Sequence, residues 1–255
     1  MNSSKALQPA PLALTLGIFG ISSLLIFTGL YVIMPLFLSS GLTFLNSYFI
    51  LFYLPFVLLF IMSLIFFRLE ENDLSWSSFK DRFRLKKLDK NTILWTLALF
   101  VFWFFVLLVV QPIVGSFFAK LPLFAPPAYF PPEINPNVAP APAGTFMGAA
   151  LLGKWWIPLC YFIGWFFNIF GEELLFRGYL LPRHELAYGK HAWIVQGVIW
   201  GLWHFFWKWN VVTLMLCTLS LAFVVQKTKN TWAGIIVHGV LNFVPLIMII
   251  LNVIG

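Results

Sequence analysis

The sequence predicts an all-α, polytopic transmembrane helical bundle with about seven spans, and three observations support this fold class. Of the 255 residues, 61% are hydrophobic and only 10% are charged, whereas soluble domains carry about 25% charged residues. The apolar residues gather into long runs, and a bilayer core of roughly 30 Å needs about 20 apolar residues per helix. Lipid offers backbone groups no water to bond with, so such runs are expected to be helices rather than open strands.

Seven apolar runs follow one another along the chain, and each is expected to form one span. The first exceeds the apolar core of a signal peptide and lacks a small-x-small cleavage site, so we expect it to remain as a span. The fifth and sixth are short and are joined around Lys208–Asn210, so we expect one of them to tilt or to end early. The runs cover about residues 12–38, 44–67, 93–114, 155–181, 192–208, 211–226 and 232–253.

Two long connections predict the orientation in the membrane. Arg68–Asn91 is rich in Lys and Arg, whereas Leu121–Ala143 holds eight of the sixteen prolines and is expected to be extended or irregular. With the N-terminus and the basic connection in the cytoplasm, twelve Lys and Arg are cytoplasmic and three are external, which is a positive-inside bias. The twelve are Lys5, Arg68, Lys80, Arg82, Arg84, Lys86, Lys87, Lys90, Arg183, Lys190, Lys227 and Lys229; the three are Lys120, Lys154 and Lys208.

The remaining composition excludes several classes of protein. The net charge of +7 does not indicate a nucleic-acid partner, because the basic residues border apolar runs, where they meet lipid headgroups. Cys160 and Cys217 lie inside apolar runs and form neither a disulfide framework nor a CxxC pair. We therefore expect an integral protein of a bacterial cell membrane that contacts the lipid bilayer and no nucleic acid.

Three charged side chains stand within six positions of the fourth run: Glu172, Glu173 and Arg177. A charge within a span costs about 2.5–3.5 kcal/mol on insertion scales, so such residues usually face an interior and mark function. Glu173 and Arg177 are i and i+4 with the acid first, the favoured order for an ion pair. Glu172 points about 100° away and is left available for general acid–base chemistry. The alternative is that the Glu–Arg pair only joins two helices.

Three further polar residues lie at matching depth in later runs. His204 is in the fifth run, and His238 and Asn242 are i and i+4 in the seventh. At about 1.5 Å per residue, these residues and Glu172 fall within about two helical turns of one another. We expect them to line one cavity open to the cytoplasm, although each could instead be a packing residue. The sequence contains no HExxH motif, no aspartate within a run and no GxSxG elbow, which argues against the corresponding proteases.

These motifs resemble those of the CPBP family, the CAAX-protease and bacteriocin-processing membrane proteins, also called Abi proteins or type II CAAX prenyl endopeptidases. The similar residues are Glu172-Glu173-x-x-x-Arg177, then His204 closing an aromatic-x-x-x-His segment, then His238-x-x-x-Asn242. Trp200 stands where the family usually has Phe. The resemblance covers roughly residues 150–250. It divides the chain into a two-span hairpin with the basic loop (1–91), a third span with the proline-rich loop (92–154) and a four-span CPBP-like catalytic core (155–255).

The resemblance implies an intramembrane endopeptidase acting on a peptide or a lipidated protein. Glu172 would activate water with the help of His204, His238 and Asn242 would hold the oxyanion, and Glu173 with Arg177 would shape the site. The family has been described both as metalloproteases and as glutamate-type proteases. We expect no required cofactor; if zinc is bound, its ligands would be Glu172, His204 and His238. The alternative function is a catalytically idle membrane scaffold or regulator that binds a membrane partner.

Overall fold

The computed structural model describes residues 7–255, so Lys5, which we counted as cytoplasmic, lies outside the described residues. The elements of the first half are α1 (Leu12–Thr28), η1 (Gly29–Ile33), α2 (Met34–Ser39), α3 (Phe44–Leu51), α4 (Leu54–Leu69), α5 (Trp76–Arg82), α6 (Lys90–Phe105), η2 (Val106–Val110) and α7 (Gln111–Ala119). Those of the second half are β1 (Thr145–Phe146), β2 (Ala149–Ala150), α8 (Trp156–Glu172), η3 (Glu173–Leu180), α9 (Leu181–Tyr188), η4 (Gly189–His191), α10 (Ala192–Trp203), η5 (His204–Asn210), α11 (Val211–Thr228) and α12 (Trp232–Ile254).

The predicted all-α membrane fold is confirmed. Within the described residues, five helical segments are long and apolar enough to cross a membrane. The fourth, Trp156–Thr228, is a continuous series of helical turns that takes in three of the seven expected runs. β1 and β2 form only a two-residue antiparallel hairpin. The segment between α7 and β1 is made of turns and irregular chain, as its prolines predict.

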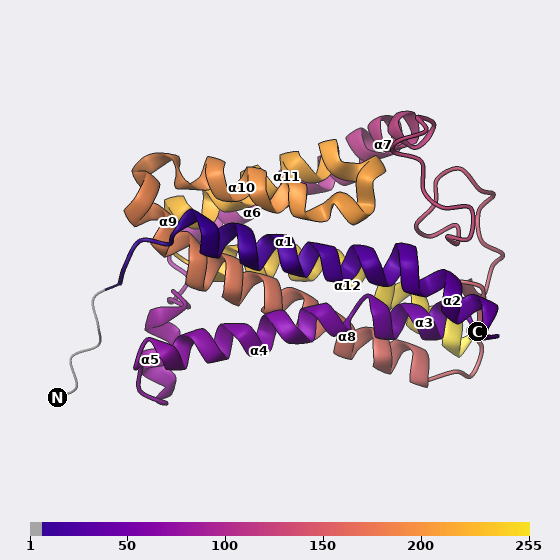
Figure 1. Ribbon diagram of the computed structural model, residues 1–255, viewed down its shortest axis with the longest axis horizontal. Helices are drawn as coiled ribbons and strands as arrows, with labels where there is room; N and C mark the ends of the chain where they lie inside the picture. The colour runs from indigo at the N-terminus through magenta and orange to yellow at the C-terminus, as the bar shows by residue number, and fades with distance from the viewer. Residues whose placement is uncertain (1–6) are drawn as a thin grey trace.

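The long helices run between two ends of the molecule (Figure 1). One end, the basic face, carries the connection 68–91 with α5, the α9–η4 turn and the turn between α11 and α12. The opposite end, the proline-rich face, carries the end of α7, the segment 120–154 and the C-terminus (Figure 1). The short fifth run is explained by an early end: α10 stops at Trp203 and the chain turns through non-helical angles at Trp207 (φ −107°, ψ 52°).

Between residues 7 and 255, three π-helical segments, η1, η2 and η3, interrupt the spans. Each precedes an α-helix whose second residue is proline: Pro35, Pro112 and Pro182. Proline has no N–H for the carbonyl four residues earlier, and its ring clashes with that carbonyl. A wider turn relieves the clash, which is a common cause of π-bulges and kinks. The proline positions thus account for the three irregular turns.

Side-chain caps begin three of the shorter or peripheral helices. Thr43, Ser75 and Asp89 each accept a hydrogen bond from the backbone N–H three residues later, as N-cap residues typically do. At Asp89, which is outside the spans, the hydrogen bonds from the side chain and backbone of Thr92 lower the pKa of the carboxyl. α6 therefore begins at a fixed residue on the basic face.

The interior of the bundle is occupied by the fourth run. α8 packs against α4 on one side and α12 on the other, while α10 and α11 form a hairpin that contacts α6 and α1. Every residue from Gly171 to Pro182 is buried. The three charged residues predicted to mark function therefore lie at the centre of the molecule.

Candidate active site

Glu172 is the last residue of α8, immediately before the π-helical turn, and its side chain is held by neutral donors. Only 1% of the residue is exposed. Asn168 Nδ2 donates to Glu172 Oε1 at 2.7 Å, and the indole Nε1 of Trp200 donates to Oε2 at 2.7 Å. Asn168 is one helical turn before Glu172 on α8, whereas Trp200 reaches across from α10. The carboxylate is therefore fixed in orientation and has no directly bonded cation.

Glu173, by contrast, is surrounded by groups that carry or accept positive charge. Its Oε1 lies 3.4 Å from Arg177 Nη1 and 3.0 Å from His238 Nδ1, and the side chains of Glu173 and Arg177 are fully buried. The guanidinium carbon of Arg177 lies 3.3 Å from the ring centroid of Trp200, a cation–π contact. Gly234 on α12 leaves room for Glu173 Oε2, with which a Cβ would collide. Glu173 thus links η3 to α12, and Arg177 extends the contact to Trp200 on α10.

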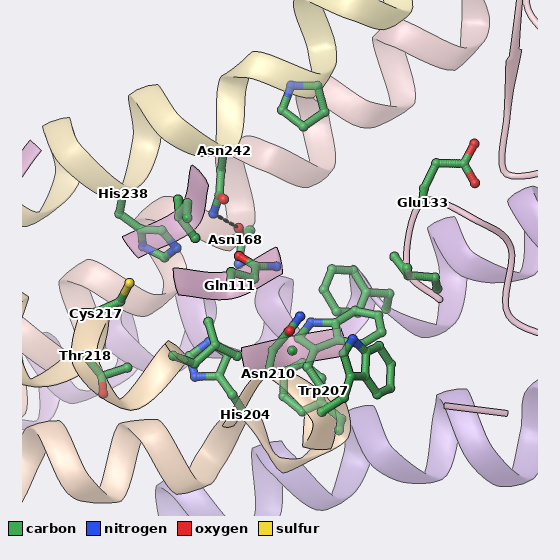
Figure 2. Close-up of a pocket in the computed structure, with 18 of the residues that line it drawn as sticks. Gln111, Glu133, Asn168, His204, Trp207, Asn210, Cys217, Thr218, His238 and Asn242 are labelled. Carbon is green, nitrogen blue, oxygen red and sulfur yellow. Dashed lines mark hydrogen bonds between the residues drawn. The ribbon is translucent and has the colours of Figure 1, made fainter. Parts of the chain in front are cut away.

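His204 and Asn242 complete the predicted set. His204 begins η5, and its Nδ1 lies 2.9 Å from the carbonyl oxygen of Trp200. A carbonyl accepts only, so this contact assigns the proton of neutral His204 to Nδ1 and leaves Nε2 as an acceptor. Asn242 Nδ2 donates to Asn168 Oδ1 at 3.4 Å (Figure 2). Asn168 therefore connects Asn242 to Glu172.

One cavity of about 570 Å³ brings the four predicted catalytic residues together, a volume typical of ligand sites. In Figure 2, His204 and the pair of His238 and Asn242 approach it from different helices. Glu173 and Arg177 are not among its lining residues. The other polar side chains on its wall are Tyr48, Tyr53, Gln111, Ser116, Glu133, Asn135, Tyr161, Asn168, Asn210 and Thr218.

The position of the cavity contradicts the expectation that it opens toward the basic face, the face that the charge bias predicts to be cytoplasmic. Glu172 and Asn242 lie near the middle of their helical segments, and from them the lining extends to Pro132–Pro136 at the proline-rich face. No residue of 68–91 or 181–191 lines it. The physical reason is the continuous burial of 171–182, which fills the space between Glu172 and the basic face.

Sequence reasoning missed two of the side chains that bond Glu172 or its neighbours. Asn168 stands four residues before Glu172, and this i, i+4 spacing is a signal that finds it. Trp200 stands where the family usually has Phe, and its indole N–H, which Phe lacks, bonds Glu172 directly. Gln111, at the start of α7, also lines the cavity, and no pattern in the sequence singles it out.

The residues proposed as zinc ligands do not form a metal-binding group. Among residues 7–255, no set of three or more His, Cys, Asp or Glu side chains is arranged to hold a metal ion. The described residues thus contain no preformed zinc group, and the chemistry proposed below is assigned to side chains and water.

One part of the chain matches a known protein family. Residues 154–244 match the family model described as "Type II CAAX prenyl endopeptidase Rce1-like", which confirms the resemblance drawn from the motifs. The match extends from just before α8 into α12 and includes all six predicted site residues. It leaves out the first three runs and the proline-rich segment. No curated protein and no solved structure matches the chain.

Proposed function

Since residues 154–244 form an Rce1-like domain of the type II CAAX prenyl endopeptidases, we propose that this protein is an intramembrane endopeptidase whose general base is Glu172. The observation that carries the proposal is the shared cavity of Glu172, His204, His238 and Asn242. Glu172 is also the one of the two adjacent glutamates that lines the cavity, while Glu173 is engaged by Arg177 and His238.

In the first step, a water molecule between Glu172 and His204 gives a proton to the Glu172 carboxylate, and its oxygen attacks the carbonyl carbon of the scissile peptide. Nε2 of His204 is an acceptor in the tautomer assigned above, so it orients the second hydrogen of the water. Trp200 and Asn168 keep the carboxylate in one orientation through their bonds to its two oxygens. Preset orientation of this kind reduces the entropic part of the barrier.

In the second step, the carbonyl oxygen becomes an oxyanion, and His238 and Asn242 donate to it. Donation from Nε2 of His238 requires a proton there, while the carboxylate of Glu173 can only accept at Nδ1. The role therefore requires a doubly protonated imidazole, whose charge Glu173 balances. A single preset oxyanion donor contributes about 2.7–4 kcal/mol. The C–N bond then breaks, and protonated Glu172 returns its proton to the leaving amine, which restores the carboxylate.

The substrate is proposed to be a membrane-associated polypeptide. The family description names CAAX prenyl endopeptidases, so lipidated C-terminal peptides are one class to test, beside unmodified apolar peptides. Comparing the peptides that accumulate in membranes with and without the functional gene would supply further candidates.

The test is the cleavage rate of these peptides by the purified protein and its Glu172→Gln variant. Glutamine preserves shape and one accepting oxygen but is not a base, and general bases contribute about 10²- to 10⁴-fold. We expect at least a hundredfold lower kcat. The matched control is Asp73→Asn, the same acid-to-amide change at an exposed residue on the basic face, which should retain activity.

Two outcomes would contradict the proposal. Equal cleavage by the wild type and Glu172→Gln would exclude Glu172 as the base. Full rescue of a deletion phenotype by Glu172→Gln would favour the scaffold function instead. Exhaustive chelation addresses the metal separately, because activity that survives it excludes an obligatory zinc ion.

A further inference from the structure

The cavity that contains the site extends along α8 from Glu172 toward the proline-rich face. Along α8 its lining runs from Tyr161 to Glu172, eleven residues or roughly 16 Å of helix. All of this length lies on the side of Glu172 that faces the proline-rich face. An extended chain rises about 3.3 Å per residue, so about five residues of a bound polypeptide fit between the outer end of the cavity and Glu172.

The outer end of the cavity reaches the surface. Pro132–Pro136 form part of the lining there, and Glu133 and Pro136 are exposed. Figure 2 shows Glu133 at the opposite end of the pocket from His238. The carboxylate of Glu133 accepts the backbone N–H of Met147 at 2.8 Å, and the hydroxyl of Tyr129 donates to the carbonyl of Leu30 at 2.9 Å. The proline-rich segment is therefore anchored to the bundle as a fixed rim.

The opposite end is closed by buried side chains and bonded charges. Beyond Glu172 lie only buried residues up to Pro182. Arg82 of α5 then bonds the carbonyls of Gly178 and Tyr179 and the carboxylate of Glu70. Phe83, which has no exposed surface, follows directly. A polypeptide arriving from the basic face would have to displace this entire layer.

The wall chemistry suits an apolar chain. Aromatic side chains make up much of the lining between the rim and Glu172: Tyr48, Phe52, Tyr53, Phe56, Trp103, Tyr161, Trp165, Trp203, Phe206, Trp207 and Trp209. Apart from Glu133 at the rim, the ionisable carboxylates and histidines of the cavity are those of the site itself, Glu172, His204 and His238. The other polar groups on the wall, among them Gln111, Asn135 and Asn210, are uncharged. The wall thus combines aromatic surface for apolar side chains with donors and acceptors that can bond the backbone of an extended chain.

We propose that the substrate reaches Glu172 from the proline-rich face, as an extended apolar segment that passes the rim Pro132–Pro136. With the basic face in the cytoplasm, as the charge bias predicts, the substrate class is a membrane-anchored polypeptide segment on the non-cytoplasmic side, rather than a cytoplasmic C-terminal tail. This inference rests on the proposed function, because it concerns the substrate of the proposed endopeptidase. The direction of access is a separate property that can be measured without turnover.

The test is side-specific labelling of single cysteines in sealed membrane vesicles of both orientations, with a membrane-impermeant thiol reagent. The background carries Cys160→Ala and Cys217→Ala. Ser116→Cys reports on the cavity, because Ser116 lines it on α7. Three matched variants calibrate the signal: Ala139→Cys is exposed on the proline-rich face, Ser77→Cys is exposed on the basic face, and Ser63→Cys is buried outside the cavity.

We expect Ser116→Cys to react from the side that labels Ala139→Cys and not from the side that labels Ser77→Cys. We also expect Ala139→Cys to label from the non-cytoplasmic side and Ser63→Cys to stay unlabelled. Labelling of Ser116→Cys from the basic side, or from neither side, would overturn the proposed direction. Labelling of Ala139→Cys from the cytoplasm would overturn the assignment to non-cytoplasmic substrates.

A second measurement connects access to turnover. The cleavage rate of Ser116→Cys is compared before and after modification with a bulky reagent applied from the proline-rich side, and we expect at least a tenfold loss. An unchanged rate after complete modification would contradict passage along this cavity. Failure of the proposed function has a different signature: undiminished cleavage by Glu172→Gln, with the labelling pattern unaffected.

Discussion

At the scale of single residues, the two adjacent glutamates are distinguished by their partners. Glu172 accepts from an amide and an indole, whereas Glu173 is paired with Arg177 and His238. Both are buried, but they point about 100° apart around the helix, so each lies in a different chemical environment. The indole of Trp200 is central to this difference, because one face stacks on Arg177 while the N–H bonds Glu172.

Replacing Trp200 with Phe tests this contribution. The ring is kept but the donor to Glu172 is lost, and a hydrogen bond to a charged group contributes about 1.5–3 kcal/mol. We expect kcat to fall about tenfold or more while KM changes little, since Trp200 acts here by positioning Glu172. Trp95→Phe is the control, because Trp95 packs on Phe223 away from the cavity. A higher KM or a lower melting temperature with unchanged kcat would assign Trp200 a packing role.

The sequence predicted which polar residues lie together better than it predicted their surroundings. Residue type and spacing single out the six proposed site residues, and the matching of their depths predicts that four of them meet, as they do in one cavity. The contact from Trp200 and the side on which the cavity lies were not predictable in this way. Both depend on how far each helix is rotated about its axis, which is set by packing between distant segments and by the π-helical turns rather than by local periodicity.

At the scale of elements, the close contact between α8 and α4 fixes the height of Glu172. A Cβ at Gly171 would lie 2.6 Å from the backbone oxygen of Phe56, so only glycine permits this approach. The contact places Glu172 beside the lining residues of α4 and directs it toward α10. Small residues at such crossings are typical of membrane bundles.

Gly171→Ala should therefore push α8 from α4. We expect a loss of ~1–3 kcal/mol in unfolding free energy, the usual cost of overpacking, together with reduced cleavage. Gly20→Ala is the matched variant, since nothing lies within 4 Å of its Cβ on α1; it should be neutral or slightly stabilising. Thermal unfolding in detergent measures both. Equal stability of the two variants would show that the free energy of unfolding does not depend on the close approach of α8 to α4.

At the scale of the whole molecule, the basic connection supports a π-helical turn to which it contributes no residue. Pro182 has no N–H for the carbonyl of Gly178, and Arg82 from α5 donates to that oxygen at 2.8 Å. The carbonyl of Phe176 already accepts the backbone N–H of Leu181 and also receives the side-chain amide of Gln196. Segments far apart in the sequence thus bond buried carbonyls of the π-helical turn.

Arg82→Ala should loosen this turn. The variant leaves the carbonyl of Gly178 without its donor and breaks the pair with Glu70, which costs about 2–3 kcal/mol. Hydrogen exchange in 173–180 should become faster, and cleavage should fall. Arg68→Ala removes a hydrogen bond at an exposed residue of the same connection and should change stability by less than about 0.5 kcal/mol. Unchanged exchange in Arg82→Ala would show that the basic connection does not stabilise the π-helical turn beside the site.

The π-helical turn after Glu172 also determines how a change in chain length acts on the helices that follow. A π-bulge amounts to one additional residue in a helix, so deletion of any one residue in 173–180 would allow the turn to tighten into a regular α-helix. The wider turn absorbs the additional residue with little net rotation, so after such a deletion the following helix would keep its angular register relative to Glu172. Arg183 and Glu185 would then still face Glu70 and Arg84, contacts that join α9 to the basic connection. An additional residue in a regular α-helix has no such turn to absorb it and would rotate all that follows by about 100°.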